Sequence, residues 1–93
     1  MAKIFASGNV TPGASAAVLS SVSCAGKMGR LVITTAGNSG YFFLAATEDI
    51  ATSSKRVAVT NAVTLDLGNV DPAGLSVITG STPPFCSFMY ILD

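Results

Sequence analysis

The stretch that decides the fold is "LVITTAGNSGYFFLAAT", residues 31–47, which contains no charged residue. A transmembrane helix needs about 20 consecutive, mainly apolar residues, and the sequence Gly-Asn-Ser-Gly at residues 37–40 interrupts this run at its centre. Gly and Asn favour turns because they tolerate positive φ. The stretch therefore predicts two strands, "RLVITTA" and "YFFLAAT", as the arms of an antiparallel hairpin.

The strand pattern continues on both sides of this stretch. In residues 56–70, "RVAVTNAVTLDLGNV", one parity holds Val57, Val59, Val63, Leu65 and Leu67, and the other holds Thr60, Thr64 and Asp66. This alternation predicts one or two half-buried strands. Turn formers follow in residues 68–74, "GNVDPAG", and the pattern resumes in residues 75–80, "LSVITG". Near the start, "KIFAS" predicts a first strand, and residues 15–23 are ambiguous between helix and strand, although Ser and Val favour strand.

The last segment, "FCSFMYILD" at residues 85–93, is apolar on both faces of a strand. One parity holds Phe85, Met89 and Ile91, and the other holds Cys86, Phe88, Tyr90 and Leu92. Such a strand lies deep in a sandwich or presents its second face to a partner. We therefore expect an assembly interface formed by Phe85, Phe88 and Tyr90, with Phe42 as a further candidate.

These segments predict an all-β fold. Seven or eight short strands, separated by Gly, Pro and Asn and with no convincing long helix, indicate an antiparallel β-sandwich or a jelly-roll-like domain. A chain of 93 residues is close to the common domain size and cannot bury two cores. Residues 1–93 are therefore expected to form a single small domain.

The composition indicates a protein that works assembled. Charged residues make up 11% of the chain, against about 25% in an ordinary soluble domain, and the net charge is zero. Low charge and large apolar patches both promote association. We expect a closed homo-oligomer, such as a trimer. The alternative is a slightly apolar monomer whose Ser and Thr residues provide the hydrated surface.

Several classes of partner and cofactor are disfavoured. Nucleic-acid binders cluster Lys and Arg, whereas the only adjacent basic pair is Lys55 and Arg56. The chain contains no His and only two cysteines, so no metal site or other cofactor is expected. Cys24 and Cys86 are either buried thiols or one disulfide. No export signal is expected, because polar residues and glycines interrupt the N-terminal apolar run, and no membrane association is expected.

Enzymatic chemistry has few candidate residues. The carboxylates are Glu48, Asp49, Asp66, Asp71 and Asp93. No His is present to activate a Ser or Cys nucleophile, and no Ser-x-x-Lys motif or phosphate-binding glycine loop occurs. We therefore expect a non-enzymatic protein. Tyr41, Phe42 and Phe43 could form a sugar-stacking platform, although aromatic residues in a strand usually belong to a core or an interface.

The order of the motifs resembles a known group. "GRLVITTAGNSGYFFLA", "SSKRVAV", "AVTLDLGNVDPAGLSVITG" and "PFCSFMYIL" follow one another across residues 22–92, as in small β-sandwich virion proteins of tailed bacteriophages. The chain departs from the commonest pattern at Pro83, Pro84 and Cys86. The group has no catalytic residues to carry over.

The resemblance implies a structural role in the virion. The expected function is capsid decoration, as a cement protein that binds the major capsid protein and stabilises the shell. The protein would be made in the host cytoplasm and would be located on the capsid surface. The alternative is a tail, baseplate or fibre component that binds a partner protein or a host glycan.

Overall fold

The computed structural model describes residues 3–37, 39–79 and 83–93. Within these residues the chain forms eight strands and two short 3₁₀ helices. In chain order they are β1 (Lys3–Val10), β2 (Ala17–Val18), β3 (Gly29–Ala36), β4 (Tyr41–Ala46), η1 (Ser53–Lys55), β5 (Val57–Thr60), β6 (Thr64–Gly68), η2 (Pro72–Gly74), β7 (Leu75–Ile78) and β8 (Phe85–Leu92). No helix in the described residues is long and apolar enough to cross a membrane.

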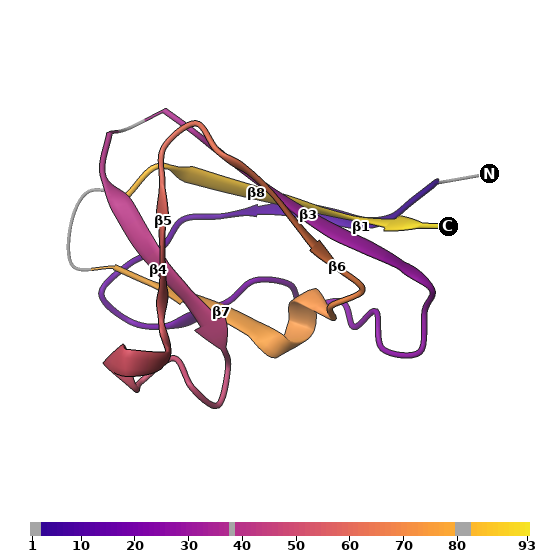
Figure 1. Ribbon diagram of the computed structural model, residues 1–93, viewed down its shortest axis with the longest axis horizontal. Helices are drawn as coiled ribbons and strands as arrows, with labels where there is room; N and C mark the ends of the chain where they lie inside the picture. Colours follow the sequence, from indigo (N-terminus) through magenta and orange to yellow (C-terminus); the bar gives the residue numbers. More distant parts are fainter. Residues whose placement is uncertain (1–2, 38, 80–82) are drawn as a thin grey trace.

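The strands form two four-stranded sheets, which confirms the predicted all-β sandwich. Sheet A has the order β1-β8-β3-β6, and sheet B has the order β2-β7-β4-β5. All described strand pairs are antiparallel. Figure 1 shows β1, β8 and β3 side by side, with the start of β1 and the end of β8 at the same end of the molecule.

The prediction of a hairpin at residues 31–47 was wrong, although both of its arms are strands. β3 pairs with β6 and β8, whereas β4 pairs with β5 and β7, so the chain crosses from sheet A to sheet B between them. Leu31 of β3 and Phe42 of β4 are both fully buried in one core cluster. Two strands that each have an apolar face can bury these faces against each other when they lie in opposite sheets.

The core lies between the two sheets, and alternate residues of β8 point into it. Cys86, Phe88 and Tyr90 are buried, while Phe85 of the opposite parity is exposed. Phe88 is paired with Gly8 across the strands, and a Cβ atom at Gly8 would lie 3.1 Å from Cε1 of Phe88. The aromatic ring therefore covers the glycine in the edge strand, a known way of stabilising such a position.

Residues 56–70 form two strands, β5 and β6, which lie in different sheets. The turn between them is held by Thr35 of β3, whose hydroxyl donates to the carbonyl oxygen of Thr60 at 2.7 Å. The same hydroxyl accepts the backbone N–H of Val63 at 3.1 Å. One buried side chain therefore satisfies two backbone groups where the chain changes sheets. Of the ambiguous residues 15–23, only Ala17–Val18 form a strand.

Candidate functional site

The structure places three of the four expected interface residues in the core, which corrects that prediction. Phe42 and Tyr90 are fully buried, and Phe88 is 7% exposed. They fill the space between the sheets because their positions in β4 and β8 face inward. Phe85 alone is available at the surface, with 60% of its area exposed.

The surface that β8 offers is its other parity, on the outer side of sheet A. We call this surface face A. It consists of Ile4, Ser7 and Asn9 of β1, Phe85, Ser87, Met89 and Ile91 of β8, Arg30, Val32 and Thr34 of β3, and Thr64 and Asp66 of β6. The cross-strand pairs Ile4–Ile91 and Val32–Met89 bring its apolar members together. Face A is therefore a sheet surface with an apolar centre.

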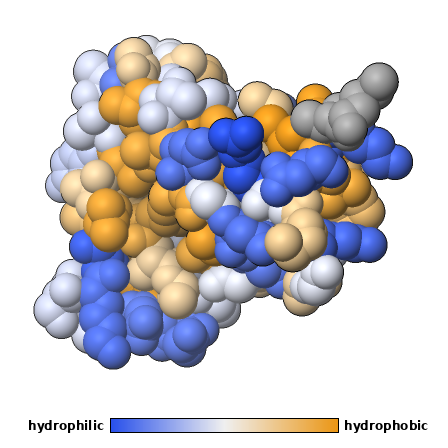
Figure 2. Space-filling view, turned by 45° about the vertical axis from the view of Figure 1, so that its right-hand side comes forward, coloured by the Kyte–Doolittle hydropathy of each residue, from blue (hydrophilic) through white to orange (hydrophobic). Residues whose placement is uncertain are grey.

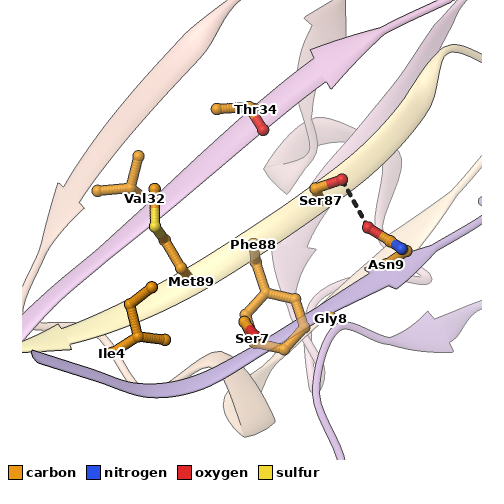
Figure 3. Close-up of a pocket in the computed structure, with 9 residues that line it drawn as sticks. All are labelled: Ile4, Ser7, Gly8, Asn9, Val32, Thr34, Ser87, Phe88 and Met89. Carbon is orange, nitrogen blue, oxygen red and sulfur yellow. Dashed lines mark hydrogen bonds between the residues drawn. The ribbon is translucent and has the colours of Figure 1, made fainter.

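A groove of about 300 Å³ lies in face A between β1, β8 and β3. Figure 3 shows Ile4, Val32 and Met89 gathered at one end of it, each from a different strand. Ser87 and Asn9 lie at the other end, where the Ser87 hydroxyl donates to Oδ1 of Asn9 at 2.7 Å. The groove thus has an apolar end and a neutral polar end.

An ion pair lies within face A, on the side of β6. Nη1 of Arg30 lies 3.3 Å from Oδ2 of Asp66, and both side chains are more than half exposed. The backbone N–H of Gly68 and then the guanidinium of Arg30 lower the pKa of Asp66 below its ordinary value. An exposed pair of this kind adds little stability, so its main effect is to place neutralised charge beside the apolar centre.

The chemistry available in the groove of face A is that of a binding surface. None of the residues that line the groove is ionisable, and the polar groups among them are hydroxyls and one amide. These groups can make apolar contacts and neutral hydrogen bonds. In the described residues there is also no group of three or more His, Cys, Asp and Glu side chains arranged to hold a metal ion.

A second exposed cluster lies on the outer side of sheet B. The rings of Tyr41 and Phe43 pack edge to face, with centroids 5.4 Å apart. The guanidinium carbon of Arg56 lies 5.6 Å from the centroid of Phe43. Tyr41 and Phe43 therefore share one face, while Phe42 between them points into the core.

Cys24 and Cys86 are free thiols and do not form the disulfide that the sequence left open as an alternative. Both cysteines are buried, and this burial is the main reason why the pKa of each thiol is raised above its ordinary value. The pKa of Cys86 is raised to about 11. The reactive form of cysteine is the thiolate. Neither residue is suited to act as a nucleophile at neutral pH.

Ile4, Val32 and Met89 were not among the interface residues predicted from the sequence. The useful signal in the sequence was the apolar character of both parities of residues 85–92. The alternation separates the two sets but does not reveal which set faces the core.

Comparisons with protein-family models, with curated proteins and with solved structures found no match to this chain.

Proposed function

We propose that this protein is a structural, non-enzymatic subunit that attaches to a larger protein shell through face A. Its specific role, which the motif order suggests, is that of a capsid decoration protein on a tailed bacteriophage. The observation that carries the proposal is the uncharged apolar centre of face A, where Ile4 is 58% exposed next to Met89 and Val32. An exposed apolar patch bordered by polar residues is typical of a protein-binding surface.

The surface as a whole supports attachment by apolar contact. Figure 2 shows hydrophobic side chains open to the surface between hydrophilic ones. Burial of apolar area stabilises a contact by about 25 cal/mol per Å². When many copies bind one lattice, modest contacts are reinforced by multivalency. A neutral protein with 11% charged residues is suited to this mode of binding.

The proposal is tested on virions of the phage that encodes the protein. We expect many copies per particle, located on the heads, and a loss of resistance to heat when the protein is removed. A second measurement adds purified protein to heads that lack it. Met89→Lys places a charge in the centre of face A and should abolish binding to heads without changing the thermal melt.

The matched control is Val57→Lys, which places the same charge at a residue of sheet B that is 61% exposed. It should bind heads as the unchanged protein does. The proposal is wrong if the protein is absent from virions, or if Met89→Lys binds heads normally.

A second candidate function uses the aromatic pair on sheet B. Tyr41 and Phe43, with Arg56 beside them, could stack against a sugar ring. This arrangement fits a tail, baseplate or fibre component that binds a host glycan. A few copies per particle, confined to tails, together with glycan binding that Tyr41→Ala abolishes, would favour this candidate over capsid decoration.

A further inference from the structure

The four outer edges of the two sheets differ in length and protection. The edge strands β2, β5 and β6 have two, four and five residues, whereas the edge strand β1 has eight. Proteins protect sheet edges by keeping them short or by adding charges and bulges. β1 has Lys3 and a register irregularity between Ile4 and Ala6 at its beginning. Its second half, residues 6–10, is regular and uncharged.

A groove of about 560 Å³ runs along this edge. One wall consists of residues 5–10 of β1 and the other of residues 18–22, with Phe88 between them. Successive side chains of a strand point to opposite faces, so six consecutive residues line one groove only where it follows the edge of the strand. The backbone edge of β1 is therefore part of the groove wall.

The backbone groups on this edge are unpaired within the described chain. Alternate residues of an edge strand direct their N–H and C=O groups away from the sheet. None of the described backbone hydrogen bonds outside the strand ladders involves residues 3–10. The groove also exposes apolar side chains, since Val18 and Val22 are each 48% exposed, and none of its lining residues is ionisable. It suits an uncharged, extended segment.

We infer that this segment is β1 of a second copy, which pairs antiparallel with the first around a twofold axis. The two A sheets then form one continuous eight-stranded sheet. β1 itself has the required character, because residues 4–10 are uncharged and small or apolar side chains alternate with polar ones in residues 6–10. A twofold contact needs a surface that is complementary to itself, and antiparallel pairing of a strand with its own copy meets this condition.

The alternation of side chains restricts the register. Facing residues must lie on the same side of the sheet, so one residue of β1 lies opposite its own copy. The ladder is centred on the uncharged residues 4–10 when this residue is Ser7, and on residues 6–10 when it is Gly8. In both registers the two Lys3 residues lie at opposite ends of the ladder, and no like charges meet. A net charge of zero adds no long-range repulsion between the copies. In this dimer the two B sheets lie on the same side of the continuous A sheet. Val18 and Val22 of each copy therefore approach the twofold axis.

The size of the contact indicates a reversible dimer. A standard interface takes about 800 Å² from each partner, which is about a sixth of the 5101 Å² surface of this protein. The walls of the groove consist of eleven residues, six in β1 and five in residues 18–22, whereas a standard interface uses about 20–30 on each side. The contact is therefore at the low end of specific interfaces, where weak and transient complexes lie, so we expect monomer and dimer in a measurable equilibrium.

The test is sedimentation equilibrium of the purified protein over a wide range of concentrations. We expect a monomer–dimer equilibrium that Val22→Lys and Ser7→Lys each weaken by about tenfold or more. Val57→Lys, at a valine outside the groove that is 61% exposed against 48% for Val22, should leave the equilibrium unchanged. A thermal melt of each variant verifies that it is folded, and Val22→Lys decides the test if Ser7→Lys disturbs β1.

A crosslinking experiment locates the contact. Ser7→Cys should give a covalent dimer with a short bifunctional thiol reagent, because native Cys24 and Cys86 are buried, and Thr60→Cys should give none. A protein that stays monomeric, or a dimer that both lysine variants leave intact, would overturn the inference. Binding of a strand from another protein in place of the second copy would overturn it as well.

The inference is independent of the proposed function. Val22 lines only the edge groove and Met89 lines only the groove in face A. Loss of the dimer in Val22→Lys, with binding to heads retained, would separate the two surfaces. A failure of one proposal is therefore distinguishable from a failure of the other.

Discussion

Asp71 accepts a hydrogen bond from the backbone N–H of Cys24, which lies 47 residues earlier in the chain, at 2.9 Å. The same carboxylate accepts the N–H of Ala73 at 3.0 Å and the hydroxyl of Ser23 at 3.0 Å. It caps the helix η2 and ties the loop before β3 to the loop before β7. A turn residue in the sequence is thus a tertiary connection in the structure.

This connection predicts a dependence of stability on pH. The N–H of Cys24 is the main cause that lowers the pKa of Asp71 below its ordinary value, which is about 3.9 in the unfolded chain. The carboxylate therefore stabilises the fold fully above pH ~4. That stabilisation is lost as the pH falls through the lowered pKa. Thermal melts at decreasing pH should show a falling Tm below this value.

Two substitutions separate the charge of Asp71 from its hydrogen bonds. Asp71→Ala should cost about 1–2 kcal/mol at neutral pH, because it removes a helix cap and the partner of Cys24. Asp71→Asn keeps an acceptor oxygen and should reduce the fall of Tm in acid. Part of the fall should remain, because Asp66 also has a lowered pKa. An unchanged acid profile in Asp71→Asn would contradict the assignment.

Neighbouring residues of β8 should respond in opposite ways to a charge. Phe88→Asp places a carboxylate in the core and removes a buried ring, so it should destabilise the domain by more than about 3 kcal/mol. Met89→Lys places its charge on face A and should leave the melt within about 0.5 kcal/mol of the unchanged protein. Urea unfolding of both variants measures this difference. Equal losses of stability would show that the two faces of β8 are not distinct.

Thr35 should stabilise the fold through the hydrogen bonds of its hydroxyl rather than through the packing of its side chain. Thr35→Val keeps the side-chain volume but leaves the N–H of Val63 and the carbonyl of Thr60 without this partner. We expect a cost of about 1–3 kcal/mol. Thr35→Ser retains the hydroxyl and should preserve the hydrogen bonds. Amide hydrogen exchange at Val63 should rise in the valine variant only.

The buried thiols should be unreactive in the folded protein. Because burial raises the pKa of Cys24 and Cys86, a thiol reagent at neutral pH should modify neither until the domain unfolds. A reductant should leave the Tm unchanged, because both cysteines are free thiols. Rapid modification of one thiol in the native protein would contradict its placement in the core.

Local pattern could predict the strands because it depends only on residues close in the sequence. Alternation in residues 56–70 located β5 and β6, and the turn chemistry of residues 68–74 located the connection that contains η2. The same reasoning paired β3 with β4, because a turn between two apolar strands is compatible with a hairpin and with a crossing between sheets. Which of these forms depends on what each strand packs against.

The amino-acid sequence by itself determined an all-β chain with a final strand apolar on both faces. Only the tertiary structure decided that Phe88 and Tyr90 face the core while Met89 faces outward, and that β1 is left as a long open edge. The physical reason is that strand periodicity defines two faces without assigning them. The assignment comes from the opposite sheet, whose residues are distant in the sequence and close only after folding.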